Sequence, residues 1–206
     1  MPKDGAVTKE KILDKAQELI LQNGFTATSI DLLIEAVGIT KGSFFYHFKS
    51  KGDLAKVLIQ RYTNRDIAYW ENLMSRAEKI SRDSLHQLQI FVGFISEEYN
   101  DLVKLKCLIA SYSYEGKQFE PEVMDLCSQG LVNGKKLVEL KIQEILKTQS
   151  TIIPVDPESL ADHFLAVYEG ALILARTWND PKIIYVQLTH FQTYLELLFQ
   201  PVDEED

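Results

Sequence analysis

The chain has 206 residues, of which 46% are hydrophobic and 25% are charged, and its net charge at pH 7 is −8. This composition is typical of a folded, soluble protein and excludes a disordered chain, while the length allows one domain of ordinary size together with a smaller one. The longest apolar run, residues 164–175, contains Glu169 and is far shorter than the roughly 20 residues of a membrane-spanning helix, so we expect no membrane partner.

The first element that the sequence predicts is an amphipathic helix over residues 9–23. Its apolar residues recur at helical spacing, at Ile12, Leu13, Ala16, Leu19 and Ile20. Asn23 and Gly24 mark its end. Residues 1–6 are polar, contain glycine and predict a mobile arm. Because they form no basic and apolar leader, we expect a cytoplasmic protein.

Residues 28–51 predict two short helices joined by a tight turn. The first helix follows a cap at Thr28 or Ser29, and its apolar residues Ile30, Leu33, Ile34 and Val37 lie on one face. Gly38 provides the left-handed backbone position that ends this helix. Thr40 can then cap a second helix over residues 41–48. This is the pattern of a helix-turn-helix.

The second of these helices carries side chains suited to DNA. Its first turn, Lys41-Gly42-Ser43, offers backbone donors and the positive end of the helix dipole to phosphate, and Gly42 lets the backbone approach a ligand closely. Donors for phosphate oxygens follow, at Tyr46, His47, Lys49 and Lys51. Three phenylalanines cannot all be exposed on so short a helix, so we assign at least Phe44 and Phe48 to the core.

The charge is distributed unevenly along the chain. Residues 1–61 contain nine Lys or Arg against seven Asp or Glu, a net charge of +2, whereas residues 62–206 contain thirteen against twenty-three, a net charge of −10. An acidic body repels DNA, so binding would depend on a compact cationic tip and would be sensitive to salt.

Residues 8–60 resemble the DNA-binding domain of the TetR family of bacterial transcriptional regulators. The match runs nearly position by position through Ile12, Ala16, Leu19, Ile20, Gly24, Phe25, Thr28-Ser29-Ile30, Ala36-Val37-Gly38-Ile39, Lys41-Gly42-Ser43 and Tyr46-His47-Phe48-Lys49-Ser50-Lys51. The resemblance implies an all-α fold of about nine helices. A three-helix helix-turn-helix DNA-binding domain, residues 1–52, would be joined by a long helix to a helical effector-binding and dimerisation domain, residues 53–206.

One position departs from the family pattern. Phe45 stands where the family usually has a tyrosine whose hydroxyl contacts phosphate, and Tyr46 is the candidate to make that contact instead. The predicted DNA-binding residues are Thr28, Ser29, Thr40, Lys41, Gly42, Ser43, Phe45, Tyr46, His47, Lys49 and Lys51.

A long helix is predicted over residues 53–81, because neither proline nor glycine interrupts it. Ser50 and Asp53 form a variant of the capping box at its start. With a length of about 40 Å at 1.5 Å per residue, this helix would belong to both domains and could transmit movement between them.

Three further helices are expected before the linker at residues 148–155. The first is capped by Asp83 or Ser84 and ends near residues 99–100, the second covers residues 102–114, and the third runs from Pro121 to about residue 148 with an apolar stripe that includes Leu140. Gly130 and Gly134 in the third indicate a close helix approach or a kink. Cys107 and Cys127 are expected to be reduced residues of the core.

Two final helices, residues 158–178 and 182–199, repeat one device, an aspartate cap followed by proline, at Asp156-Pro157 and Asp180-Pro181. Both have strongly apolar faces, and Gly170 with its neighbouring alanines would admit another helix. This apolar surface is more than one partner can cover, so we expect a homodimer through residues 158–199, which is also where the family usually dimerises. The acidic tail, residues 203–206, is expected to be solvated.

The leading hypothesis is a homodimeric repressor whose recognition helices read the half-sites of a palindromic operator in double-stranded DNA. The resemblance supplies the idea that a small-molecule inducer, bound among helices of residues 62–178, separates the two heads and releases the operator. Candidate ligand residues are Trp70, Phe94, Tyr112 and His163, for each of which ordinary core or interface packing is the alternative.

Two other classes of protein, an enzyme and a helical sensor or scaffold, are the alternatives to a regulator. An enzyme is disfavoured because His47, His86, His163 and His190 are too scattered for a helical metal pair and no Cys-x-x-Cys or Gly-x-Ser-x-Gly motif occurs, so we expect no catalytic residue, metal or cofactor. The alternative is a helical sensor or scaffold whose helix-turn-helix serves protein contacts. The donors on the second helix argue against it, because such a protein would not need them.

Overall fold

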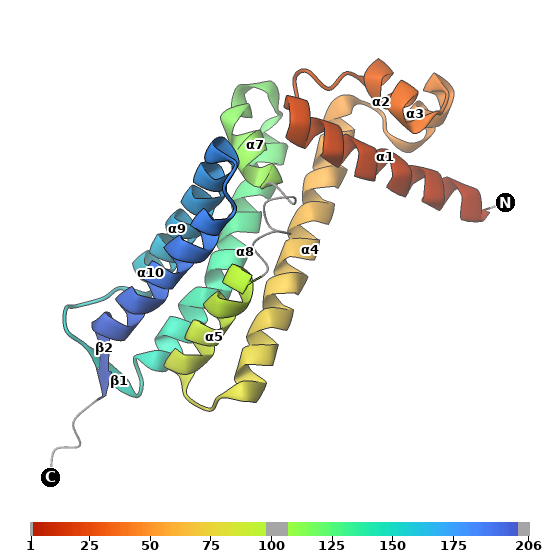
Figure 1. Cartoon of the computed structure of the whole chain (residues 1–206). Helices are drawn as coiled ribbons and strands as arrows, with labels where there is room; N and C mark the ends of the chain where they lie inside the picture. Colours follow the sequence, from red (N-terminus) through yellow and green to blue (C-terminus); the bar gives the residue numbers. More distant parts are fainter. Residues whose placement is uncertain (1, 98–106, 202–206) are drawn as a thin grey trace, which may run out of the picture. The chain divides into compact units, whose positions relative to one another are not determined.

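The computed structural model describes residues 2–97 and 107–201, and these residues form nine α-helices, one 3-10 helix and two short strands (Figure 1). The elements are α1 (Pro2–Asn23), α2 (Ile30–Val37), α3 (Lys41–His47), α4 (Lys51–Ile80), α5 (Ser84–Glu97), α7 (Leu108–Tyr114), η1 (Gly116–Gln118), α8 (Pro121–Ile145), β1 (Gln149–Thr151), α9 (Pro157–Trp178), α10 (Lys182–Leu198) and β2 (Phe199–Pro201). The expected all-α class is confirmed.

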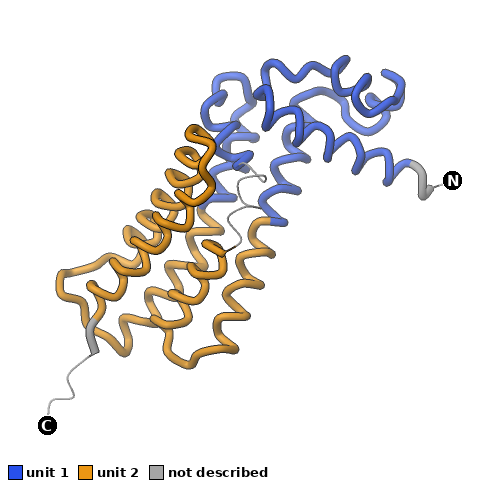
Figure 2. Tube along the Cα trace, viewed as in Figure 1, with its two compact units in different colours: residues 1–65, 107–131 blue, residues 66–106, 132–206 orange. Residues whose placement is uncertain are grey.

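The chain packs as two compact units (Figure 2). Unit 1 comprises residues 1–65 and 107–131, and unit 2 comprises residues 66–106 and 132–206. Helices α4 and α8 each contribute residues to both units. The packing thus divides the chain differently from the predicted boundary between residues 52 and 53, which remains a prediction about function.

Unit 1 surrounds the helix-turn-helix with one apolar core. Phe44 and Phe48 are buried there, as predicted, together with Ile12, Ala16 and Ile20 of α1. The core also contains residues outside the predicted DNA-binding domain, Leu108, Ile109, Tyr112, Val123 and Cys127. Segment 107–131 therefore packs as part of this unit, which the local sequence pattern did not reveal.

Helix α1 begins at Pro2, so the prediction of a mobile arm is wrong for residues 2–6. Proline is well suited to the first turn of a helix, because it has no N–H to lose and its φ is already near the helical value. A lysine, an aspartate and an alanine follow at residues 3, 4 and 6, and a single glycine among them does not stop the helix.

An ion-pair cluster joins α1 to α4 within unit 1. Arg61 Nη1 donates to Glu10 Oε2 and to Asp14 Oδ1, each over 2.8 Å. Arg61 is mostly buried, with 12% of its side chain exposed, whereas both carboxylates are largely exposed. The cluster fixes the position of α1 along α4.

Unit 2 is a helical bundle in which α10 packs against α9 and α5. Its core contains an aromatic cluster in which the ring of Trp70 lies 5.5–5.9 Å from those of Phe91, Phe164 and Tyr168. The cap of α9 is as predicted, since Asp156 Oδ2 accepts from Ser159 N over 2.8 Å and Pro157 is the first helical residue. Helix α10 begins at Lys182, as expected, but its N-cap is Pro181 and not Asp180.

The predicted apolar stripe of α8 needs one correction. Leu140 is 48% exposed, whereas its neighbour Lys141 is 5% exposed. Lys141 Nζ donates to Glu78 Oε1, Gln87 Oε1 and Glu144 Oε2 over 2.7–2.9 Å, so partners on three helices compensate for the buried charge. Periodicity could not identify this network, because Glu78 and Gln87 are 63 and 54 positions from Lys141 in sequence.

The cap of α5, the linker after α8 and the helix before η1 are also predicted from the sequence. Asp83 caps α5, since its Oδ1 accepts from His86 N over 2.7 Å. The predicted linker contains β1, which pairs antiparallel with β2. The expected helix over residues 102–114 is described only from Leu108, and residues 99–100, 102–106 and 203–206 lie outside the described residues.

Candidate nucleic-acid interface

The turn of the helix-turn-helix forms as the sequence predicts. Ser29 caps α2, with Oγ accepting from Leu32 N over 3.1 Å. Gly38 follows α2 with φ 73° and ψ 40°, a left-handed conformation that glycine adopts at little cost, and its N–H bonds to the carbonyls of Glu35 and Ile34. These local contacts set where α2 ends and α3 begins.

Helix α3 presents its predicted residues to solvent. Thr40 Oγ1 accepts from Ser43 N over 3.1 Å, and Thr40, Lys41 and Gly42 are exposed. A Cβ atom at Gly42 would have only ordinary contact, 3.9 Å from Thr40 Oγ1, so packing within the chain does not require glycine there. An exposed glycine on this turn leaves the backbone open to a ligand.

The remaining residues of α3 differ in exposure. Tyr46 is 81% exposed and Phe45 is 44% exposed, although both are large aromatic side chains. Ser43 and His47 are half-buried, and the ring of His47 lies 4.9 Å from that of Tyr46. Exposed aromatic residues beside cations are well suited to contact a nucleic acid, and Tyr46 has the hydroxyl that Phe45 lacks.

The cations of this surface are held loosely. Lys41 Nζ lies 3.3 Å from Asp31 Oδ1, but both side chains are largely exposed, so the pair contributes little and phosphate could replace the carboxylate. Lys49 is also exposed, and its backbone N–H donates to Asp53 Oδ2 over 2.9 Å. Lys41 and Lys49 are therefore available for phosphate.

Thr28 and Lys51 differ from the other predicted residues, because the side chains of both donate hydrogen bonds to backbone carbonyls within the protein. Thr28 is fully buried, and its hydroxyl donates to Gly24 O over 2.8 Å, so it has no surface to offer DNA. Lys51 Nζ donates to the carbonyls of Phe25 and Thr26 over 2.5 and 3.3 Å. Burial lowers the pKa of Lys51, and the charge of Glu115 opposes that shift only in part. The structure therefore gives Lys51 partners inside the protein.

The four candidate ligand residues do not gather at one site. Tyr112 lies in the core of unit 1, whereas Trp70, Phe94 and His163 belong to unit 2. His163 is exposed on α9, with its ring 5.4 Å from that of Tyr194. Trp70 remains a candidate, because its buried indole N–H has no hydrogen-bond acceptor among the described residues.

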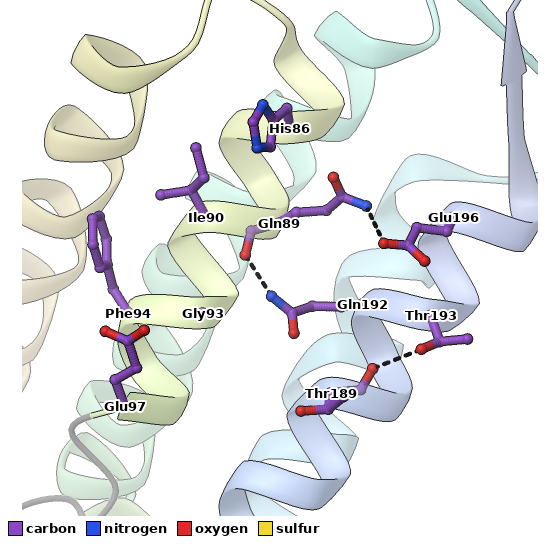
Figure 3. Close-up of a pocket in the computed structure, with 10 residues that line it drawn as sticks. All are labelled: His86, Gln89, Ile90, Gly93, Phe94, Glu97, Thr189, Gln192, Thr193 and Glu196. Carbon is purple, nitrogen blue, oxygen red and sulfur yellow. Dashed lines mark hydrogen bonds between the residues drawn. The ribbon is translucent and has the colours of Figure 1, made fainter.

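Phe94 lines an open groove of about 410 Å³ between α5 and α10 (Figure 3). Its ring lies 4.2 Å from the guanidinium carbon of Arg76. Gln192 Nε2 donates to Gln89 O over 2.7 Å, and Gln89 Nε2 donates to Glu196 Oε1 over 3.2 Å. These hydrogen bonds join α5 to α10 along the groove.

Metal ligands, cysteines and apolar helices are the other possible functional features of the described residues. No group of three or more His, Cys, Asp or Glu among them could hold a metal ion. Cys127 is buried in the core of unit 1, which raises the pKa of its thiol to about 11. Within the same residues, no helix is both long and apolar enough to span a membrane.

The capped turn, the buried Phe44 and Phe48, and the exposed residues of α3 define a helix-turn-helix protein of the DNA-binding class. Residues 12–58 match the family described as bacterial regulatory proteins, tetR family. The chain is 30% identical over 199 residues to the probable HTH-type transcriptional regulator YttP of Bacillus subtilis (strain 168), with 95% of this chain and 90% of that protein covered.

Two further comparisons agree. The chain is 24% identical over 165 residues to the HTH-type transcriptional repressor DhaR of Mycobacterium sp. (strain GP1), with 80% of each protein covered. Its fold is similar to the crystal structure of a TetR-family transcriptional regulator from Agrobacterium tumefaciens, with a TM-score of 0.77, 21% identity and coverage of 95% of this chain and 100% of that one. The chain belongs to the TetR family and is a DNA-binding transcriptional regulator.

Proposed function

We propose that this regulator is a homodimeric repressor in the cytoplasm, where it binds a palindromic operator and is released by a small-molecule inducer. The observation that carries the proposal is that the chain has two exposed surfaces of different kinds. One is the exposed face of α3, and the other is an apolar face on α9 and α10. The relative DhaR, which is named a repressor, supports the direction of the regulation.

The apolar face on α9 and α10 supports dimerisation. Ile173 on α9 is 41% exposed, and Val186 and Leu197 on α10 are 43% and 66% exposed. Gly170 lies one turn before Ile173, and a Cβ atom there would meet nothing within 4 Å. Small and apolar residues exposed along two adjacent helices are suited to a symmetric contact with the same helices of a second chain.

A dimer explains how so small a recognition helix could select an operator. Each α3 has only seven residues, Lys41–His47, and its exposed side chains can read only a few base pairs. Two copies related by a two-fold axis would read two half-sites about 34–36 Å apart, one turn of the DNA helix. The operator would then be a palindrome, and an inducer that changed the distance between the two heads would weaken both half-site contacts together.

The test is a selection from randomised DNA duplexes with the full chain at moderate salt, combined with measurement of the molar mass by light scattering. We expect a dimer and enrichment of a palindrome. A dimer that enriches no sequence would overturn the assignment as an operator-binding repressor, and a monomer that enriches a single half-site would overturn the symmetric mechanism. A reporter placed downstream of the enriched site would then show whether binding represses transcription.

A further inference from the structure

Glu115 lies between α7 and η1, far outside the helix-turn-helix in sequence, yet its carboxylate binds the turn between α1 and α2. Its Oε1 accepts from Phe25 N over 2.7 Å, and its Oε2 accepts from Thr26 N over 2.8 Å and from Thr26 Oγ1 over 2.5 Å. All of these residues belong to unit 1. The carboxylate therefore satisfies consecutive backbone donors that neither helix can satisfy.

Lys51 holds the same two residues from their carbonyl side. Its ammonium donates to Phe25 O and Thr26 O and lies 4.2 Å from the centre of the Phe25 ring. The N–H groups of the turn thus bind an anion and its carbonyls bind a cation. Hydrogen bonds to charged groups are roughly twice as strong as those between neutral groups, so the conformation of this turn is strongly determined.

The side chain of Phe25 is held as firmly as its backbone. Its ring lies 4.3 Å from that of Phe119 and 5.7 Å from that of Tyr112, and these two rings stack on each other at 4.4 Å. Phe25 is 6% exposed, although it belongs to a surface turn. Segment 112–119 thus contacts both the ring of Phe25 and the backbone amides of the turn.

Gly24 provides the space for this arrangement. Its φ is 85°, and a Cβ atom there would lie 2.8 Å from Glu115 Oε1. Any other residue at position 24 would therefore displace the carboxylate as well as strain the backbone. The missing side chain of Gly24 thus leaves room for the carboxylate of Glu115.

The turn leads directly into the DNA-reading element. Thr28 N donates to Phe25 O over 3.2 Å, and Ser29 then caps α2. We propose that Glu115 is a positioning residue for DNA binding, which holds the turn at Phe25 and Thr26 and so fixes the start of the helix-turn-helix. On this proposal, segment 107–131, which lies outside residues 12–58 that match the family model, is a working part of the DNA-binding head.

Charge supports the assignment. Burial opposes ionisation of Glu115, but the hydrogen bonds from Thr26 and Phe25, together with the charge of Lys51, outweigh it and lower the pKa of Glu115. The carboxylate is therefore ionised at neutral pH. Nearby Glu122 differs, since it is 68% exposed and pairs with Lys56 on the surface.

The test compares Glu115→Gln with Glu122→Gln, which removes the same charge from the same segment without touching the turn. The inference rests on the DNA binding of the proposed function, so the probe is the duplex that the parent protein enriches from a random pool. At a temperature where both variants are fully folded, we expect Glu115→Gln to lose affinity by roughly tenfold or more and Glu122→Gln to match the parent.

A second measurement does not depend on DNA. The amides of Phe25 and Thr26 should exchange with solvent more slowly in the parent and in Glu122→Gln than in Glu115→Gln, as followed by NMR. If the parent enriches no duplex, the proposed function fails, while unchanged exchange in Glu115→Gln overturns the role of Glu115 by itself.

Milder variants decide the question if Glu115→Gln does not fold. Thr26→Val removes only the hydroxyl that donates to Glu115, whereas Thr26→Ser retains it. We expect Thr26→Val to weaken binding and Thr26→Ser to restore it. A folded Glu115→Gln, or failing that a folded Thr26→Val, that binds the enriched duplex as tightly as the parent would overturn the proposal, because a purely structural role lowers stability without lowering affinity.

Discussion

The ammonium of Lys51 lies 2.5 Å from the carbonyl oxygen of Phe25 and 4.2 Å from the centre of the Phe25 ring. We predict that this lysine, held by a carbonyl and an aromatic face inside its own unit, stabilises the fold and makes no phosphate contact. Lys49, two residues earlier, is exposed. Removal of Lys51 and removal of Lys49 should therefore have different effects on stability and on DNA binding.

We predict that Lys51→Ala lowers the free energy of unfolding by ~1–2 kcal/mol, because a hydrogen-bonded cation and its cation–π contact are lost. The salt dependence of DNA binding should stay as in the parent. Lys49→Ala should have the reverse effects, with stability unchanged and the slope of log K against log salt reduced by about 1 per subunit. Urea unfolding and DNA titrations at several salt concentrations measure both quantities. A smaller slope for Lys51→Ala would show that Lys51 does contact phosphate.

The contrast between these lysines shows which features of the structure can be predicted from residues that are close in sequence. The caps at Ser29 and Thr40, the left-handed Gly38 and the burial of Phe44 and Phe48 all depend on residues a few positions apart, so periodicity and turn chemistry predict them. Glu115 is 90 positions from Phe25, and its role depends on how segment 107–131 folds back within unit 1. The nearest signal in the sequence is Glu115-Gly116, which directly follows the predicted helix over residues 102–114 and by itself predicts only the end of that helix.

Charged residues were predicted less well than apolar ones for a related reason. An apolar side chain at a core position is stable next to almost any other, whereas a buried cation such as Lys141 needs particular partners on other helices. Helical spacing locates the buried face of α8 but not the side chains opposite it. The spacing therefore places Leu140 on the buried face and does not predict the burial of Lys141.

Asp66 on α4 should make the stability depend on pH. Burial raises the pKa of its carboxyl from 3.8 to about 6. As pH rises between these values, the unfolded chain loses this proton more readily than the folded chain does, so folding becomes less favourable, and the full cost is reached above pH 6. We predict that Asp66→Asn raises the free energy of unfolding by ~1–3 kcal/mol at pH 7.5 and by much less near pH 4.

Urea unfolding at these two pH values measures the effect of Asp66→Asn. Glu71→Gln is the matched control, because Glu71 is an exposed carboxylate on the same helix, and it should change stability little at either pH. A gain for Asp66→Asn that is equal at both pH values would show that the raised pKa is not its source.

Gly130 allows α8 to approach α4 within unit 1. A Cβ atom there would lie 2.4 Å from Thr63 Cγ2 and 3.1 Å from Ile109 Cδ1, and Thr63 is itself buried. We predict that Gly130→Ala destabilises the protein by ~1–3 kcal/mol, because overpacking exceeds the gain in helix propensity. Thermal unfolding followed by circular dichroism measures the change.

Gly134→Ala is the control for that prediction. It lies one turn further along α8, where a Cβ atom would have ordinary contact with Trp70 at 3.5 Å. Alanine there should be neutral or stabilise by up to ~1 kcal/mol through its helix propensity. Equal effects of the two substitutions would mean that the close approach at Gly130 relaxes without cost.

The proposed dimer makes Ile173 on α9 a decisive position. It is 41% exposed and lies one turn from Gly170, so a glutamate there would place two like charges at the symmetric contact. We predict that Ile173→Glu is a folded monomer in light scattering and binds the palindrome at least ~100-fold more weakly, because the half-sites are no longer bound together. Val132→Glu makes a similar change at a 52% exposed residue on α8 and should remain dimeric. If Ile173→Glu stays dimeric while retaining full affinity, the subunits associate through another surface, and the exposed face of α9 and α10 must serve a different partner.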